Sequence, residues 1–166
     1  MSRLRPLLCA LVLALAGCAS LDRAEDLQVG QSTAETVIAR YGQPVRRWPE
    51  PDGGQTLEYS TQPNGRRCHM LRFGPDGRLL AVRETLNYAS RFSIEPGMSE
   101  EQVSRLLGQE RSRVFFRFSG EEVWDWNVEP DQSGYLLRFN VHFKAHRVVR
   151  LSQSVVYPDR IPFGDR

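Results

Sequence analysis

The sequence predicts an α+β fold built from two tandem repeats, each with a short N-terminal helical segment packed on an antiparallel β-sheet of three to four strands. Three observations support this prediction. A capped helix motif at Ser99 has a close counterpart at Ser32. Beyond these motifs, Leu71-Arg72-Phe73 recurs 66 residues later as Leu137-Arg138-Phe139, a spacing that indicates internal duplication. Each motif is followed by runs of alternating apolar and polar residues, which are separated by turns containing glycine and proline.

The helix of the second repeat is expected to begin at Ser99, a favourable N-cap that forms a capping box with Gln102 three residues later. Val103, Leu106 and Leu107 follow at the spacing of one apolar helix face, and a glycine ends the segment. Residues 32–42 of the first repeat show the same order of cap, acid, valine and closing glycine. We therefore expect a second helix there.

The strands of the first repeat are expected at residues 56–61, 67–73 and 78–88, after an irregular excursion at residues 46–54. Those of the second repeat are expected at residues 113–118, 123–128, 135–143 and 147–157. Strand alternation assigns these side chains to the core beneath the helices: Leu57, Tyr59, His69, Leu71, Phe73, Leu80, Val82, Leu86 and Tyr88 in the first repeat, and Trp124, Trp126, Tyr135, Leu137, Phe139, Val141, Phe143, Val149, Leu151, Val155 and Tyr157 in the second.

The N-terminal segment predicts export and a lipid anchor. Arg3 and Arg5 precede an apolar run that is too short to cross a bilayer and is typical of a cleavable signal. The residues before Cys18 resemble a bacterial lipobox, so Cys18 is the expected lipid-attachment site. Several acyl chains together anchor a protein stably. Ala19 and Ser20 resemble the residues that direct enterobacterial lipoproteins to the outer membrane, and we expect this protein on its periplasmic face.

The expected organisation is a lipoprotein signal peptide at residues 1–17, a tether at 18–26, one repeat at 27–89, a second at 90–157 and a C-terminal tail at 158–166. Each repeat alone would bury only a marginal core. We therefore expect the two repeats to pack together.

The charge balance excludes a strongly basic class of protein. The full chain has 22 basic and 20 acidic residues, and removal of the predicted leader takes away two arginines and no acids. The mature chain would then be formally neutral. Nucleic-acid binding needs a clustered excess of basic residues, so we expect no nucleic-acid partner.

The sequence offers no set of catalytic residues. Cys68 is interpreted as a buried packing residue, because an unpaired thiol in an oxidising compartment usually survives when it is buried. A Cys–His nucleophile is not expected, because the neighbouring His69 points to the opposite face of the predicted strand. His142 and His146 straddle a predicted strand end, so we interpret them as exposed side chains rather than as metal ligands. We therefore expect no enzyme, no metal site and no cofactor other than the covalent lipid.

The stretch from Gly97 to Gly108, Gly-Met-Ser-Glu-Glu-Gln-Val-Ser-Arg-Leu-Leu-Gly, resembles the G-M-[ST]-x-x-Q-V-x-x-L-L-G signature of the SmpA/OmlA lipoprotein family. That family includes BamE, a subunit of the machine that assembles outer-membrane β-barrels. Trp124-Asp125-Trp126 is similar to the family's W-x-Y strand, and residues 137–149 are similar to its closing hairpin. The tandem arrangement also resembles the β-lactamase-inhibitor-protein fold, in which two helix-plus-sheet repeats present a concave binding surface.

These resemblances imply a non-enzymatic, BamE-like protein-binding module that supports outer-membrane β-barrel assembly or envelope integrity. Its partner would be an envelope protein, and its anchor would hold it at the outer membrane. The alternative is an inhibitor or ligand-binding module of the β-lactamase-inhibitor type, which would act on an envelope enzyme.

Strand alternation also predicts a candidate partner-binding face on the side of the strands turned away from the helices. Methionine and arginine are enriched at interfaces, which favours binding. An ordinary solvated sheet face, with arginine stems covering apolar surface, is the alternative. The predicted face consists of Met70, Arg72, Leu136, Arg138, Asn140, His142, Val148 and Arg150.

Overall fold

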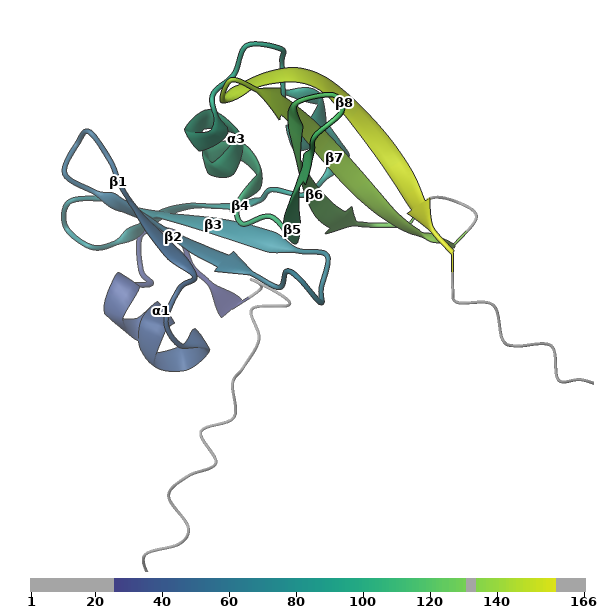
Figure 1. Ribbon diagram of the computed structural model, residues 1–166. Helices are drawn as coiled ribbons and strands as arrows, with labels where there is room; N and C mark the ends of the chain where they lie inside the picture. Colours follow the sequence, from purple (N-terminus) through teal and green to yellow (C-terminus); the bar gives the residue numbers. More distant parts are fainter. Residues whose placement is uncertain (1–25, 131–133, 158–166) are drawn as a thin grey trace, which may run out of the picture.

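Two four-stranded antiparallel sheets and three helices make up the part of the chain that the computed structural model describes, residues 26–130 and 134–157 (Figure 1). This confirms the α+β class and the antiparallel sheets. The elements are α1 (Ala34–Tyr41), β1 (Arg46–Pro49), β2 (Gln55–Ser60), β3 (Cys68–Phe73), β4 (Leu79–Glu84), α2 (Tyr88–Phe92), α3 (Glu100–Leu107), β5 (Ser112–Phe116), β6 (Glu121–Val128), β7 (Leu136–Lys144) and β8 (Arg147–Val156). Strands β1 to β4 form the first sheet and β5 to β8 the second, each in sequence order.

The predictions for the leader, for Cys18 and for the C-terminal tail lie outside the described residues. Within those residues, no helix has both the length and the apolar character needed to cross a membrane.

Local capping forms α1 and α3 where the sequence predicts helices. The Ser99 hydroxyl accepts a hydrogen bond from the Gln102 backbone N–H at 3.2 Å, and the Gln102 side chain accepts one from the Ser99 N–H at 2.8 Å. The N-cap of α1 is Thr33 rather than Ser32, because Thr33 forms the same reciprocal pair with Thr36. The predicted boundary is therefore displaced by one residue.

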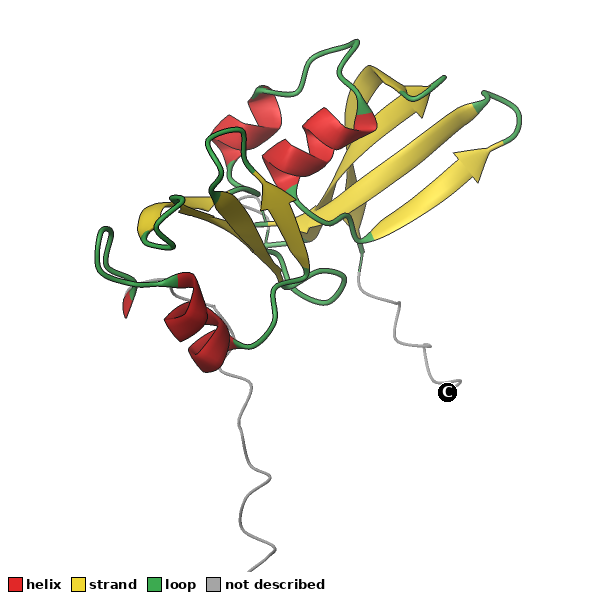
Figure 2. Ribbon diagram, turned by 90° about the vertical axis from the view of Figure 1, so that its left-hand side faces the viewer, coloured by secondary structure: helices red, strands yellow, loops and turns green. Residues whose placement is uncertain are grey.

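The layers stack in the order α1, first sheet, α3, second sheet (Figures 1 and 2). On one face of the first sheet, Val37 of α1 packs with Leu57, Leu71 and Phe73. The opposite face contributes Met70 to a larger core that also contains residues of α3 and of the second sheet. Both faces of the first sheet are therefore used in packing, and the shared core confirms that the two halves of the chain pack together.

The C-terminal end of α3 is held by side chains of the first half. The Arg83 guanidinium donates hydrogen bonds to the carbonyl oxygens of Arg105 and Leu106, both at 3.0 Å. The Thr85 hydroxyl donates to the Leu107 carbonyl at 2.8 Å. Because the last carbonyls of a helix have no partner within the helix, these bonds satisfy groups that would otherwise need water.

A buried carboxylate lies just beyond α3. Glu58 of β2 is fully buried and accepts hydrogen bonds from the indole N–H of Trp48 at 3.0 Å and from the backbone N–H of Gln109. Burial raises the pKa of Glu58, and the two hydrogen bonds oppose that rise. From the second sheet, the Trp126 indole N–H donates to the Gly108 carbonyl at 3.1 Å. The junction between the halves is thus both apolar and hydrogen-bonded.

Two elements differ from the sequence prediction. The first four residues of the predicted excursion at 46–54 form β1, in which Arg46 lies opposite Glu58 of β2. Pro49 is tolerated because it ends an edge strand. The strand predicted to reach residue 88 ends at Glu84, since the side chain of Asn87 accepts a hydrogen bond from the Ser90 N–H at 2.9 Å and caps α2.

A β-bulge also changes the predicted core of the first half. It lies at Phe73, whose partner on β4 is Leu79. Leu79 is therefore fully buried, whereas Leu80, which was predicted to be a core residue, is 47% exposed. Other side chains wrongly predicted to be buried lie close to or beyond strand ends, where packing is incomplete: Tyr88, Tyr135, Val155 and Tyr157.

Candidate binding surface

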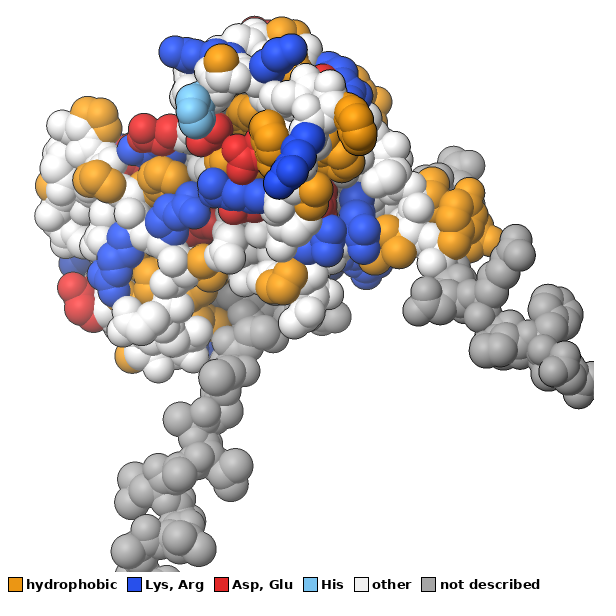
Figure 3. All heavy atoms as spheres, in the orientation of Figure 1, with side chains coloured by type: hydrophobic (Ala, Val, Ile, Leu, Met, Phe, Trp, Pro, Cys, Tyr) orange, Lys and Arg blue, Asp and Glu red, His pale blue; other side chains and the backbone are white. Residues whose placement is uncertain are grey.

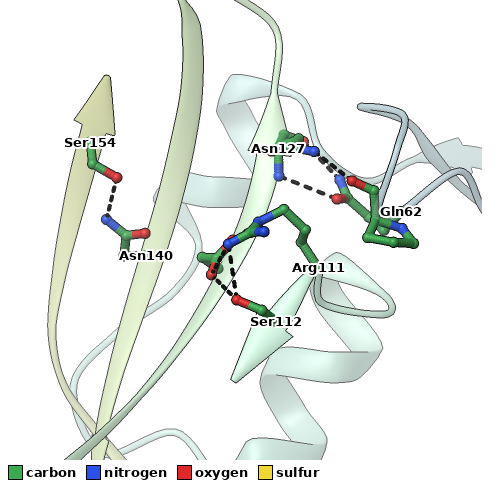
Figure 4. A network of polar contacts seen from close by, with 8 residues as sticks. Gln62, Arg111, Ser112, Asn127, Asn140 and Ser154 are labelled. Carbon is green, nitrogen blue, oxygen red and sulfur yellow. Dashed lines mark hydrogen bonds and ion pairs between the residues drawn. The ribbon is translucent and has the colours of Figure 1, made fainter. Parts of the chain in front are cut away.

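The outer face of the second sheet, the side turned away from α3, carries a row of polar side chains that crosses all four strands. The register places Ser112 opposite Asp125, Asp125 opposite Asn140, and Asn140 opposite Ser152. The Asn140 amide donates a hydrogen bond to the Ser154 hydroxyl at 3.2 Å (Figure 4) and another to the Ser152 hydroxyl at 3.3 Å. Cross-strand pairing thus gathers residues far apart in the sequence into one polar surface.

At one end of this row, Asp125 is held by two donors. Its carboxylate accepts hydrogen bonds from both sides of the Arg111 guanidinium fork, with a distance of 2.9 Å from Nη2 to Oδ2, and from the Ser112 hydroxyl (Figure 4). A bidentate arginine–carboxylate pair fixes geometry as well as charge. Because Asp125 is almost fully buried, this pairing also satisfies a charge that would be costly to bury alone.

At the other end, His142 connects a carboxylate to a hydroxyl. Its Nδ1 lies 3.0 Å from Oε2 of Glu121, and its Nε2 lies 2.8 Å from the Ser152 hydroxyl. The Arg150 guanidinium donates to the same Glu121 oxygen at 2.7 Å. The hydrogen bonds from Arg150 and from His142 lower the pKa of Glu121, so this carboxylate is ionised at neutral pH.

This chain of contacts has the connectivity of a base-activated serine, in which a carboxylate orients a histidine that meets a hydroxyl. Two features argue against that chemistry. Arg150 binds the same carboxylate and offsets the negative charge that would stabilise a protonated His142. Asn140 donates to the Ser152 oxygen, which withdraws electron density from the atom that would attack. We therefore interpret the cluster as a network that holds the surface in one arrangement.

The first half of the chain closes one end of the outer face. Strand β5 begins at Ser112, which lies opposite Asp125, so the backbone of Asn127 further along β6 has no partner on β5. The Gln62 side chain takes that place: its amide donates to the Asn127 carbonyl at 2.8 Å and its oxygen accepts from the Asn127 N–H at 3.3 Å (Figure 4). The Asn127 side chain returns a bond to the Pro63 carbonyl at 2.8 Å. The Gln62 side chain, on the loop between β2 and β3, thus pairs with the Asn127 backbone where a neighbouring strand would otherwise do so.

Five of the eight predicted face residues lie on this outer face, as strand alternation requires: Leu136, Arg138, Asn140, His142 and Arg150. Their role in binding a partner stays a prediction. The expectation that His142 is a solvated side chain is wrong, because Glu121 and Ser152 enclose it and leave it 7% exposed.

The other three predicted residues lie elsewhere. Met70 is 4% exposed because α3 and the second sheet cover its face of the first sheet, so it offers no binding surface. Arg72 is half-buried on that face and forms ion pairs with Glu50 at 3.4 Å and with Asp52 at 2.7 Å. In Figure 3, basic and acidic side chains are intermixed along this junction. Val148 is buried because a bulge between β7 and β8 turns it inward.

The exposure of Cys68 and of His146 bears on how the sequence analysis interpreted these two residues. Cys68 is fully buried, and burial raises the pKa of its thiol to about 12, which confirms its interpretation as a packing residue. His146 is exposed, and its Nδ1 lies 2.8 Å from Oε1 of Glu100. Over the described residues, no three His, Cys, Asp or Glu side chains gather in a way that could hold a metal ion.

The sequence interpretation missed Glu121, Asp125 and Ser152 as members of the surface. Glu121 falls between the strands predicted at 113–118 and 123–128, and nothing local connects it to His142 or Ser152, which lie 21 and 31 residues further along the chain. A signal was nevertheless present. Alternation with the buried tryptophans of β6 places Glu121 and Asp125 on one common face.

The chain matches no protein-family model and no curated protein. Among solved structures it is similar to a proposed β-lactamase inhibitor protein from Streptococcus mutans, with 10% identity over 78% of this chain and 91% of that one and a TM-score of 0.32. It is also similar to a DUF4309 family protein from Bacillus subtilis (15% identity, 78% and 81% coverage, TM-score 0.31). A third is an extracellular protein containing an SCP domain from Bacillus anthracis (12% identity, 85% and 53% coverage, TM-score 0.32). Similarity at this level defines no family.

Proposed function

We propose that this protein is a non-enzymatic outer-membrane lipoprotein whose folded part is a BamE-like protein-binding module in the periplasm, supporting β-barrel assembly or envelope integrity. The observation that supports binding most directly is the outer face of the second sheet. Its charged and polar side chains are already held in place by one another, from Arg111 and Asp125 on one side to His142 and Arg150 on the other.

A preformed surface lowers the entropy that is lost on association. The face also has unused donor capacity. Arg138 lies beyond the Asp125 cluster, opposite Asn127 of β6 and Ser154 of β8, and forms no ion pair in the described part of the chain. Arg150 of β8 lies at the other end of the face, opposite His142; it is half-exposed and has one carboxylate partner, Glu121. An acidic segment of a partner protein would satisfy both guanidinium groups, and charge complementarity would orient it.

We also propose that the two halves are copies of one helix-plus-sheet module, as in a tandem SmpA/OmlA domain. The helices α1 and α3 each have eight residues, a reciprocal cap and a closing glycine, Gly42 or Gly108, with φ of 83° or 81°. Each is followed by four antiparallel strands in sequence order. This common order supports duplication, together with the repeated sequence motifs.

The lipid anchor is a separate part of the proposal. Mass spectrometry of the protein purified from membranes should find acyl chains on Cys18 at the N-terminus. The Cys18→Ser variant should leave the membrane fraction, because the lipid thioether needs that sulfur. An unmodified chain that begins elsewhere would refute the anchor but leave the binding function standing.

The second candidate is an inhibitor of the β-lactamase-inhibitor type. It is favoured by the contribution of both halves to the outer face, through the contact of Gln62 with Asn127. Copurification of the tagged full chain from solubilised outer membranes distinguishes the two candidates. Recovery of barrel-assembly subunits supports the first, and recovery of a hydrolase whose activity falls on binding supports the second. Recovery of neither would refute both.

A further inference from the structure

A groove lies between α2 and strand β8, on the inner side of the second sheet. It has a volume of about 780 Å³ and is lined by the rings of Tyr88 and Phe92 on α2, by Phe139 of β7, and by Leu151 and Gln153 of β8. Tyr88 and Phe92 stack on each other with ring centroids 4.1 Å apart, yet each is 67% exposed. Aromatic rings beside a groove are typical of recognition sites.

The Arg91 cation faces this groove, and Glu84 is the acidic residue that acts on it electrostatically without forming an ion pair. The Arg91 guanidinium lies 5.8 Å from the ring centroids of both Tyr88 and Phe139, and its Nε donates a long hydrogen bond to the Asn87 carbonyl. Within the described residues it forms no ion pair. The acid on the groove rim, Glu129, pairs instead with Arg66 at 3.7 Å. A ligand that brings a negative charge would compensate Arg91.

The groove runs along a strand edge that has no partner strand within residues 26–130 and 134–157 over most of its length. Strand β8 is the last strand of its sheet. Near its start, the segment before α3 pairs with it: the Gly97 N–H donates to the Val148 carbonyl at 2.8 Å, and the Val148 N–H donates to the Met98 carbonyl at 2.9 Å. From residue 151 to 156 no strand of the described chain pairs with this free edge of β8. Six residues of strand offer about 20 Å of backbone donors and acceptors.

The composition of this edge differs from that of the other sheet edges. Natural proteins protect edges with charges, prolines or short strands. Strand β1 has four residues, two of them arginines and one a proline, β4 ends in an arginine and a glutamate, and β5 has only five residues with one arginine. Residues 151–156 of β8, Leu-Ser-Gln-Ser-Val-Val, contain neither charge nor proline. This edge is therefore open to pairing.

We propose that β8 and the groove beside α2 bind an extended segment of a partner protein by strand addition. Main-chain hydrogen bonds to β8 would supply affinity, alternate apolar side chains would enter the groove against Tyr88, Phe92 and Leu151, and one acidic side chain would pair with Arg91. The inference rests on the proposed protein-binding function, but it uses a different surface from the outer face of the second sheet.

The probe is a random decapeptide library displayed on phage and selected against the full chain. The enriched peptides should alternate apolar residues and carry an acid. One of them, labelled with fluorescein, is then titrated by anisotropy. Gln153→Lys places a charge on the edge and in the groove, and Arg91→Gln removes the cation. Each should weaken binding by about tenfold or more, Gln153→Lys because a charged side chain on an edge opposes strand pairing and Arg91→Gln because a charge-assisted contact is lost. The matched controls are Val114→Lys, on the opposite edge of the same sheet, and Arg117→Gln in an exposed turn, and both should change binding less than twofold.

Hydrogen exchange separates strand addition from simple occupation of the groove. Peptide binding should slow exchange of the amides of residues 151–156. No enrichment, binding without this protection, or equal losses in the control variants would overturn the proposal. If these amides are already protected in the free chain and lose protection on dilution or on removal of residues 158–166, a second copy or the chain's own tail occupies the edge, which also overturns it. Undiminished capture of an envelope partner by Gln153→Lys would remove this inference and leave the proposed function standing.

Discussion

The junction between the two halves can be tested with a single methyl group. Gly108 ends α3 with φ of 81°, and a Cβ added there would lie 2.3 Å from Sγ of Cys68 and 3.1 Å from Oε1 of Glu58. Gly42 ends α1 with nearly the same φ, 83°, but a Cβ there would meet nothing within 4 Å. The two positions therefore separate the backbone cost of alanine from the cost of the clash.

The expected magnitudes follow from this difference. Gly42→Ala should cost about 1 to 3 kcal/mol of unfolding free energy, because its backbone, with φ of 83° and ψ of −172°, lies in a region that is essentially restricted to glycine. Gly108→Ala should add about 1 to 3 kcal/mol for overpacking against the thiol. Cys68→Ala alone should cost about 1 kcal/mol for lost buried volume. In the double variant the thiol is absent, so Gly108→Ala should there cost only about as much as Gly42→Ala.

Urea denaturation of the four variants and the parent chain measures these energies. The double-mutant cycle should give a coupling energy of about 1 to 3 kcal/mol between positions 68 and 108, because Cys68→Ala reduces the cost of Gly108→Ala by that amount. Equal costs for Gly42→Ala and Gly108→Ala, or no relief from Cys68→Ala, would show that α3 does not pack against the first sheet as described.

Three further predictions concern buried or hydrogen-bonded groups. The Cys68 thiol, whose pKa is raised to about 12 by burial, should react with a thiol reagent only as fast as the protein unfolds, and rapid labelling of the native chain would contradict its placement. Ser152 should not be labelled by a fluorophosphonate, since Arg150 and Asn140 oppose its activation; a stoichiometric adduct would establish it as a nucleophile. Burial raises the pKa of Glu58 above its ordinary value of 4.5, so the stability that the protonated group contributes is present below pH 4.5 and is lost between pH 4.5 and its folded pKa. Over that interval the unfolding free energy of the Glu58→Gln variant should fall less than that of the parent chain, as urea melts at several pH values can check.

Local chemistry made the helices and most strands predictable. The capping box of Ser99 and Gln102 needs only residues three apart, and it forms as the sequence indicates. Strand alternation predicted the wrong side chains to be buried where a β-bulge interrupts the two-residue period. One extra residue in β8 exchanges the roles of Val148 and Val149, so the first is buried and the second exposed. No periodic rule detects such an insertion.

The candidate surface was only half predictable, for a different reason. Alternation correctly placed Arg138, Asn140 and Arg150 on one side of their sheet. It could not show that Met70, on the equivalent side of the first sheet, is covered by α3, because that depends on how the two halves dock. Likewise, the contact of His142 with Glu121 arises only once β6 and β7 are in register.

Partner capture by the outer face is the most direct test of the proposed function. The double variant Arg138→Gln/Arg150→Gln removes two positive charges from this face, and Arg40→Gln/Arg47→Gln removes two from exposed positions on the first half. The variants are matched in the arginine that each removes, because Arg40 and Arg150 are 57% and 54% exposed and each has one ion pair, with Asp26 and with Glu121. Glu121 keeps its hydrogen bond to His142 when Arg150 is replaced. Thermal midpoints should stay close to that of the parent chain, since exposed pairs contribute little.

The measurement is the amount of envelope partner copurified with each tagged variant, relative to the parent chain, at physiological salt. The outer-face variant should recover about tenfold less partner, as expected when charge complementarity is lost at an interface, while the first-half variant should recover the same amount as the parent. Full recovery by a folded outer-face variant would contradict the assignment of the binding surface.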